Sequence, residues 1–356
     1  MNFKNKLKRY CTTLSFLLLV CQASLAQNTT QTKDSLRTPE KTKLNALDSI
    51  YNQGTQQYTQ CDPNFIYQFS KPKFWDMFRY IPNDLYRFGK FTVQKENLKW
   101  DALVLGSTAA IIPYDQKLLE DAGEIGHKLG GWDKDSKYGK VFGVLTIVPK
   151  NIPSAVYYIG NGGTTLLLSG MFYGIGKLHH NDARALNTSN ELVECLFSVG
   201  VTTQTIKRMT GRQSPSRALL TGNDGGEWNP FPSFSAYQSR TPNYDAMPSG
   251  HIATFMATVT IIATNYPEHK WIKPVGYSTM GLLAFNMVSG KVHWTSDYPI
   301  GIFIGYVMGK EIANRRITKI AKNKVGLMAP VKNHYKLNYS MNNYFNTTLV
   351  GATITF

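Results

Sequence analysis

The sequence predicts a mainly α-helical protein, a bundle of about six helices with a polar N-terminal extension and a small β-rich tail. Apolar runs of helical length recur along the chain, separated by Gly, Pro, Asn and charged residues. Beyond about Leu327 the pattern changes to alternating apolar and polar residues, which is typical of strands in a hairpin. The expected helices lie near residues 100–114, 153–178, 190–209, 250–266, 275–292 and 297–312.

The first residues have the order of a secretory signal peptide. Basic residues precede a short apolar run at 14–20, and small residues follow it up to Ala26. We predict cleavage after Ala26 and therefore an exported protein, periplasmic or attached to a cell-envelope membrane, with its site outside the cytoplasm. An uncleaved anchor is the alternative, although the apolar run is short for a full span.

Three further boundaries follow from composition. Residues 27–60 are polar and predict a linker. Residues 61–95 are aromatic and basic, and predict a segment that lies on a membrane surface or packs on the main domain. The main helical domain covers 96–320 and the β-rich tail 321–356. No run in the domain is an unbroken apolar stretch of about twenty residues, so a soluble core and a bundle of short membrane helices both remain open.

The chain is basic, with a formal net charge of +16. An exported basic protein suits anionic partners such as phosphates or lipid headgroups, so a membrane surface is an expected partner. Nucleic acid is not expected, because there is no basic stretch with interleaved aromatics and no known binding module. Cys61 and Cys195, which follow the predicted signal peptide, are expected to be unlinked thiols.

One candidate site residue stands at the start of a predicted helix. His251 follows Pro248, Ser249 and Gly250, directly before the apolar run that begins at Ile252. Ser249 is a natural N-cap, and Gly250 lets a ligand approach the backbone closely. The free N–H groups and the dipole of such a helix favour an anion beside His251.

Two other segments carry complementary chemistry. His293 and Asp297 are four residues apart, so the carboxylate can hold one ring nitrogen and leave the other as a nucleophile or base. Lys207, Arg208 and Arg212 surround a Gly turn at the end of a helical run, a pattern that suits binding of phosphate oxygens.

In this order the three segments resemble the signature of the type-2 phosphatidic acid phosphatase and vanadium haloperoxidase-like superfamily: K-x6-R-P, P-S-G-H and S-R-x5-H-x3-D. The middle motif is complete at residues 248–251, His293 and Asp297 match the third, and Lys207 and Pro215 match the first. The resemblance covers roughly residues 95–312. It implies a helical bundle with the site at one end, in agreement with the apolar pattern.

The resemblance also implies roles. His293 would attack phosphorus and form a phosphohistidine, Asp297 would orient its ring, and His251 would serve as general acid and then as base. No metal or other cofactor is expected. The phosphate oxygens would be held by Lys207, Arg212, Ser249 and the Gly250 N–H.

Two arginines of the signature are missing. Ser214 replaces the arginine of the first motif, and Asn286 and Met287 replace the Ser-Arg pair of the third. Each uncompensated phosphate contact costs about 1.5–3 kcal/mol. The replacement charge is expected from Arg212, which lies two residues before Ser214, or from Arg217 or Lys291.

The expected function is that of a metal-independent acid phosphatase acting on a lipid phosphate or a small phosphate ester. The lipid could be of the phosphatidylglycerol phosphate, isoprenyl diphosphate or lipid A type. A vanadate-dependent haloperoxidase and a non-catalytic envelope protein that binds lipid phosphates are the alternatives. Residues 216–246 form a long loop rich in aromatic residues. Its aromatic side chains either contact the leaving group or hold the loop against the bundle. The segment contains Trp228, Pro230, Phe231, Pro232, Phe234 and Tyr237.

Overall fold

The computed structural model describes residues 56–132, 138–141, 145–179, 181–321, 336–344 and 347–355. The chain divides into two units, residues 1–40 and 41–356, and every described residue belongs to the second. The predicted signal peptide and all but the last five residues of the predicted linker lie outside the described residues, so both stay predictions.

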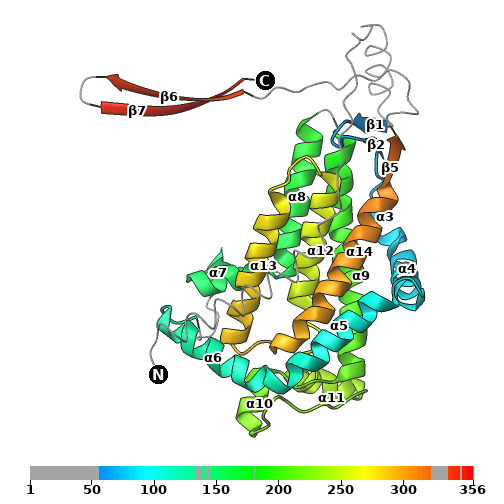
Figure 1. The fold of residues 1–356 in the computed structure, drawn as a ribbon, viewed down its shortest axis with the longest axis vertical. Helices are drawn as coiled ribbons and strands as arrows, with labels where there is room; N and C mark the ends of the chain where they lie inside the picture. Colours follow the sequence, from blue (N-terminus) through cyan, green and yellow to red (C-terminus); the bar gives the residue numbers. More distant parts are fainter. Residues whose placement is uncertain are drawn as a thin grey trace. The chain divides into compact units, whose positions relative to one another are not determined.

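Long helices running side by side make up the centre of the second unit (Figure 1). This confirms the prediction of a mainly helical protein, and each of the six predicted runs is helical. The five central helices are α8 (Gly162–Leu178), α9 (Ala183–Thr210), α12 (Gly250–Asn265), α13 (Ile272–Ser289) and α14 (Tyr298–Arg316).

Helices α12 and α14 approach each other along a row of glycines. A Cβ atom on Gly305 would lie 2.2 Å from the carbonyl oxygen of Ala253, and one on Gly301 would lie 2.8 Å from that of Ser249. Only a residue without a side chain fits at these contacts. The close packing therefore brings the first turn of α12 beside the start of α14, where the two histidine motifs lie.

The predicted boundaries differ from the structure in two runs. The run at 153–178 forms two helices, α7 (Ile152–Ile159) and α8, because Asn161 caps α8 by accepting a hydrogen bond from the N–H of Gly163. The run at 100–114 ends as a 3₁₀ turn, η1 (Ile112–Tyr114), after α5 (Leu98–Ile111).

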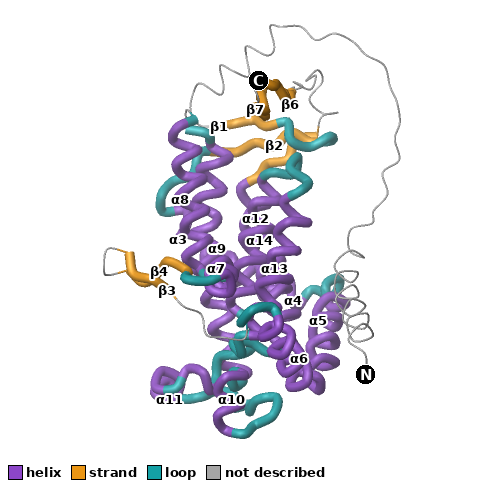
Figure 2. The backbone as a smooth tube through the Cα atoms, turned by 90° about the vertical axis from the view of Figure 1, so that its left-hand side faces the viewer, coloured by secondary structure: helices purple, strands orange, loops and turns teal. Residues whose placement is uncertain are grey.

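Shorter helices that the prediction did not contain surround the bundle. They are α3 (Asp76–Arg79), α4 (Ile81–Val93), α6 (Asp115–Lys128), α10 (Pro215–Thr221), α11 (Phe234–Ser239), and the 3₁₀ turns η2 (Thr241–Asn243) and η3 (Thr295–Asp297). Helices α10 and α11 lie at the end of the bundle opposite a small sheet (Figure 2).

That sheet joins distant parts of the chain. Strands β1 (Gln56–Thr59), β2 (Phe65–Ser70) and β5 (Ile317–Ala321) pair antiparallel in the order β1-β2-β5. The described residues also include two hairpins. One pairs β3 (Tyr138–Val141) with β4 (Leu145–Pro149), and the other, in the predicted β-rich tail, pairs β6 (Lys336–Tyr344) with β7 (Thr347–Thr355).

The aromatic segment at 61–95 packs on the bundle through part of its rings. The ring centroid of Phe78 lies 5.3 Å from that of Phe197, and that of Phe88 lies 6.2 Å from that of Phe303. Trp75, in contrast, is 70% exposed. Within the described ranges, none of the helices has the length and apolar character needed to cross a bilayer. Cys61 and Cys195 are free thiols, as expected.

Candidate active site

The first turn of α12 has the geometry that the motif predicts. The Oγ atom of Ser249 accepts a hydrogen bond from the N–H of Ile252 at 3.4 Å and caps the helix. The N–H groups of Gly250 and His251 have no acceptor within the described part of the chain. They are therefore available to an anion at this helix terminus.

His293 and Asp297 lie in the loop between α13 and α14. The Nδ1 atom of His293 is 3.4 Å from Oδ2 of Asp297, and the same oxygen accepts a hydrogen bond from the N–H of Trp294 at 2.8 Å. Both side chains are buried. In this arrangement the carboxylate holds one ring nitrogen of His293, and Nε2 has no partner among the described residues.

The structure brings the two histidine motifs together. The N–H of Ser249 donates to the carbonyl oxygen of Asp297 at 3.1 Å. The ring centroids of His251 and His293 lie 6.0 Å apart, with the ring planes at 70°. Two imidazoles at this separation can act on opposite sides of one small reacting group.

Burial is the main influence on the protonation of His251. Tyr157 of α7 covers the ring at a centroid distance of 4.7 Å. The pKa of His251 is lowered to about 3, mainly by burial and to a smaller extent by His293 and Lys207. Without a bound anion, His251 is therefore neutral near pH 7.

Lys207, in the last turn of α9, is a buried cation on the same side of the molecule. Its Nζ atom is 3.8 Å from Oδ2 of Asp245, a distance too long for a hydrogen bond. Burial lowers the pKa of Lys207, and the charges of Asp245 and Asp297 oppose that shift. Lys207 therefore interacts electrostatically with Asp297, and it also interacts with His251.

Arg212 does not have the geometry of the predicted phosphate ligand. Its Nη1 atom donates to Oγ of Ser296 at 2.6 Å and to Oδ1 of Asp297 at 2.9 Å. Its Nη2 atom donates to Oδ2 of Asp115 at 2.6 Å and to the carbonyl oxygen of Gly225 at 3.1 Å. The side chain is fully buried, so the sequence was misleading here: the charge lies behind Asp297 and is already paired.

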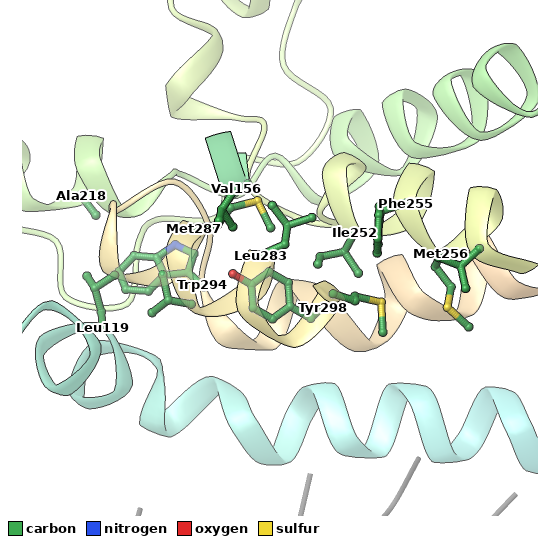
Figure 3. Packing of buried hydrophobic residues seen from close by; sticks show 14 residues of the cluster. Leu119, Val156, Ala218, Ile252, Phe255, Met256, Leu283, Met287, Trp294 and Tyr298 are labelled. Atoms are coloured by element: carbon green, nitrogen blue, oxygen red, sulfur yellow. The ribbon is translucent and has the colours of Figure 1, made fainter. Parts of the chain in front are cut away.

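The positions of the missing arginines are filled by packing. Met287 is fully buried in an apolar cluster with Leu283 and Trp294 (Figure 3). Asn286 donates from Nδ2 to the carbonyl oxygen of Pro153 at 3.1 Å, and Ser214 is buried. Ser214 and Met287 carry no charge, so the phosphate contacts of the signature's two arginines are not made from these positions.

Arg217 and Lys291 are the other two cations that the sequence offers near the site. Arg217 donates from Nε to Oδ1 of Asn243 at 3.0 Å, and its terminal nitrogens have no partner within the described ranges. The carbonyl oxygen of Lys291 accepts from the N–H of Ser216 at 3.0 Å, which ties the loop before His293 to the start of α10.

The aromatic residues of 216–246 divide into two groups. Tyr237 is buried, donates to Oε1 of Gln204 at 2.9 Å, and lies 4.4 Å under the guanidinium of Arg208. Trp228 lies 4.8 Å from the guanidinium of Arg212. These two rings pin the loop to the bundle. Phe231 and Phe234 are exposed and remain candidates for substrate contact.

Sequence analysis missed Asp115, which is the first residue of α6. Its Oδ1 atom accepts from the N–H of Ser296 at 3.0 Å, and its Oδ2 atom accepts from the Ser296 hydroxyl and from Arg212. An acidic residue directly after the run at 100–114 is typical of a helix start. That signal gives no indication of a partner far along the chain.

A scan of family models matches residues 189–320 to the PAP2 superfamily. These residues are a PAP2 segment. The matched range contains Lys207, His251, His293 and Asp297, so the resemblance seen in the motifs is confirmed, whereas Asp115 and Tyr157 lie before it. No curated protein and no solved structure matches the chain.

Members of the PAP2 superfamily are generally phosphatases or related phosphoesterases, so the match places the PAP2 segment in a class that acts on phosphorylated substrates. In the part of the chain that the structure describes, no group of three or more His, Cys, Asp or Glu side chains is placed to hold a metal ion.

Proposed function

We propose that the protein is a metal-independent acid phosphatase that hydrolyses a phosphate monoester or diphosphate through a phosphohistidine on His293. One observation carries the proposal. Two histidines from separate motifs lie 6.0 Å apart, and a buried carboxylate holds Nδ1 of one of them. Such a reaction needs a nucleophile held in orientation by another side chain, here His293 and Asp297. It also needs a second titratable group nearby, here His251.

In the first step, Nε2 of His293 attacks phosphorus in line with the leaving oxygen. A P–N bond forms, the P–O bond to the leaving group breaks, and the electron pair of that bond goes to the leaving oxygen. The Nδ1 proton stays between His293 and Asp297, whose negative charge stabilises the cationic ring. The buried position of Asp297 strengthens this interaction, because water does not screen it.

His251 supplies the proton for the leaving oxygen. Its pKa is about 3 in the free protein, so it gains a proton only when an anionic phosphate lies beside it and favours the charged ring. After the leaving group departs as an alcohol, neutral His251 takes a proton from water. The oxygen of that water then attacks phosphorus, the P–N bond breaks, and phosphate and free His293 result.

The phosphate oxygens are held by donors at the first turn of α12 and by nearby cations. The N–H of Gly250, the Ser249 hydroxyl and the Lys207 ammonium supply hydrogen bonds where negative charge develops. Since Arg212 is paired elsewhere, Arg217 and Lys291 replace the missing arginines in this proposal.

The proposed substrate is a lipid phosphate of the phosphatidylglycerol phosphate, isoprenyl diphosphate or lipid A type, because apolar side chains are exposed both within the PAP2 segment and on α8 before it. Phe231 and Phe234 are 74% and 70% exposed, and Leu167 and Leu178 of α8 are also exposed. Such surfaces mark contact with apolar partners. Together with the predicted signal peptide, they support a protein exported to the periplasm or cell envelope that works at a membrane surface.

A second candidate is a non-catalytic protein that binds lipid phosphates. Met287 favours it, because a buried apolar residue stands where the signature has an arginine. The intact pair of His293 and Asp297 favours catalysis instead.

The test is phosphate release by the purified protein from a panel of lipid phosphates and p-nitrophenyl phosphate, in EDTA, beside His293→Ala. Turnover that disappears in the variant supports the phosphatase. Equal background from both proteins, with retained binding of lipid phosphate, supports the non-catalytic candidate. Bromide oxidation that depends on added vanadate would instead indicate a haloperoxidase.

A further inference from the structure

Behind Asp297 lies a buried group made of Asp115, Arg212 and Ser296. Asp115 and Asp297 share one guanidinium: Arg212 reaches Asp115 through Nη2 at 2.6 Å and Asp297 through Nη1 at 2.9 Å. Ser296 accepts from Arg212 and donates to Asp115 through both its hydroxyl and its N–H. Asp115 is 1% exposed and the other members are fully buried.

This group restricts the orientation of the Asp297 carboxylate. Arg212 binds Oδ1, and therefore Oδ2 is the oxygen that faces Nδ1 of His293 and the N–H of Trp294. Rotation of the carboxylate would break the bond to Arg212. The Cζ atom of Arg212 also lies near two indole rings, 4.8 Å from the ring centroid of Trp228 and 5.2 Å from that of Trp294.

Asp115 also fixes the turn that carries Asp297. Both of its oxygens bind Ser296, the residue before Asp297 in the 3₁₀ turn η3. Through Ser296 it positions the backbone of the turn, and through Arg212 it positions the side chain. Asp115 on α6 is thus connected to Asp297 in two ways, through Ser296 and through Arg212.

The charges point the same way. Within this group two buried carboxylates share one guanidinium, and one of them, Asp297, also faces the ring of His293. If Asp115 were neutral, Arg212 would direct its whole charge to Asp297 and weaken the hold of Asp297 on the Nδ1 proton.

We propose that Asp115, supplied by α6 before the PAP2 segment, is a positioning residue that sets the tautomer of His293 through Arg212 and Ser296. Its effect on turnover rests on the proposed phosphatase function. Its effect on the tautomer does not require turnover. Asp115 touches neither substrate nor the reacting atoms and acts only through Asp297.

The test uses Asp115→Asn and Ser296→Ala in the full chain, with Asp84→Asn as matched control. Asp84 is also 1% exposed and also binds a serine and an arginine, but its arginine is Arg315 at the other end of α14. That end is about 27 Å along the helix from Tyr298. The readouts are kcat and KM for p-nitrophenyl phosphate, and the imidazole ¹⁵N spectrum of His293.

We expect wild type to show one tautomer of His293, with the proton on Nδ1. Asp115→Asn and Ser296→Ala should populate the other tautomer and lower kcat, with KM unchanged, by about 100-fold for Asp115→Asn. Asp84→Asn should be destabilised yet keep the wild-type spectrum and kcat.

A folded Asp115→Asn protein with the wild-type tautomer would overturn the inference. If Asp115→Asn does not fold, Ser296→Ala decides instead, because it removes one hydroxyl and no charge. A folded Ser296→Ala protein with the wild-type tautomer would then overturn the inference. If wild type has no turnover, the proposed function fails, and the tautomer spectra still decide the role of Asp115.

Discussion

Two groups of similar arrangement, each built on a buried aspartate, lie at opposite ends of α14. In each, an aspartate at the start of a helix accepts hydrogen bonds from a serine hydroxyl and from an arginine, and the arginine also binds a second carboxylate. The members are Asp115, Ser296, Arg212 and Asp297 at the histidine end, and Asp84, Ser198, Arg315 and Glu194 at the sheet end.

The two groups differ in what the second carboxylate binds next. Glu194 accepts from a second arginine, Arg316, so two carboxylates meet two guanidiniums. Asp297 meets His293 instead, a ring that can become positive. The second carboxylate is therefore bound by arginines at one end of α14, and by an arginine and a histidine at the other. Only at the histidine end does it contact a side chain that takes part in the proposed reaction.

The largest expected effect on kcat distinguishes Asp297 from Glu194, the second carboxylate in each group. Asp297→Asn should reduce kcat by about 10⁴-fold, because an amide in that position favours the wrong tautomer of the histidine. Glu194→Gln should leave the kcat of the folded protein at the wild-type value. Steady-state kinetics on samples matched for folded fraction make the comparison. A comparable loss in both variants would contradict the division of roles.

Replacing Arg212 or Arg315 should lower the free energy of unfolding by similar amounts, but only replacement of Arg212 should lower activity. Arg212→Met and Arg315→Met each remove the arginine bound to a buried aspartate, Asp115 or Asp84, at a cost of about 3–5 kcal/mol in the free energy of unfolding. Urea unfolding measures this. Below the unfolding midpoint, Arg315→Met should turn over like wild type, whereas Arg212→Met should not. Full activity in folded Arg212→Met would break the proposed distinction.

The sheet end should show a pH dependence of stability to which Glu191 and Glu194 both contribute, because burial raises the pKa of each to about 8. Burial is the main cause that raises the pKa of Glu191 to about 8, and its Oε1 atom has no hydrogen-bond partner in the described residues. Because the folded-state pKa lies above the ordinary value of 4.5, this contribution to stability is present at low pH and is lost as pH rises toward 8.

Glu191→Gln tests that contribution. The variant should be more stable than wild type at pH 9 and close to it at pH 5, with kcat unchanged, as measured by urea unfolding at both pH values. A stability difference that is the same at pH 5 and pH 9 would show that Glu191 does not titrate in this range.

The smallest expected effect concerns the aromatic rings over the two arginines. Trp228→Leu removes a ring 4.8 Å from Arg212, and Tyr80→Leu removes one 4.6 Å from Arg315. Each loss should cost about 0.5–1 kcal/mol in unfolding free energy. Only Trp228→Leu should also lower kcat, because only Arg212 supports Asp297.

The parts of the site that sequence could predict are local. The Ser249 cap, the position of His251 in the first turn of α12, and the four-residue spacing of His293 and Asp297 all follow from neighbours along the chain. The apolar periodicity likewise predicts the long helices, because each buries a side against the others.

The parts that it could not predict depend on partners far away in sequence. Arg212 is visible as a charge within the first motif, but its partner Asp115 lies 97 residues earlier and no periodicity connects them. Strand β5 likewise follows α14 directly and is defined only by pairing with β2. Sequence shows where a charge stands, and the fold determines whether it is already paired.

The most direct test of the central claim is to trap the covalent intermediate. Wild type and His251→Asn would be mixed with p-nitrophenyl phosphate, whose phenolate leaves without a proton from His251, then quenched in alkali and mapped by mass spectrometry. The account predicts an alkali-stable, acid-labile phosphoryl group on His293, more abundant in His251→Asn because the base for hydrolysis is missing. Turnover without a phosphoryl group on His293, or turnover by His293→Ala, would contradict it.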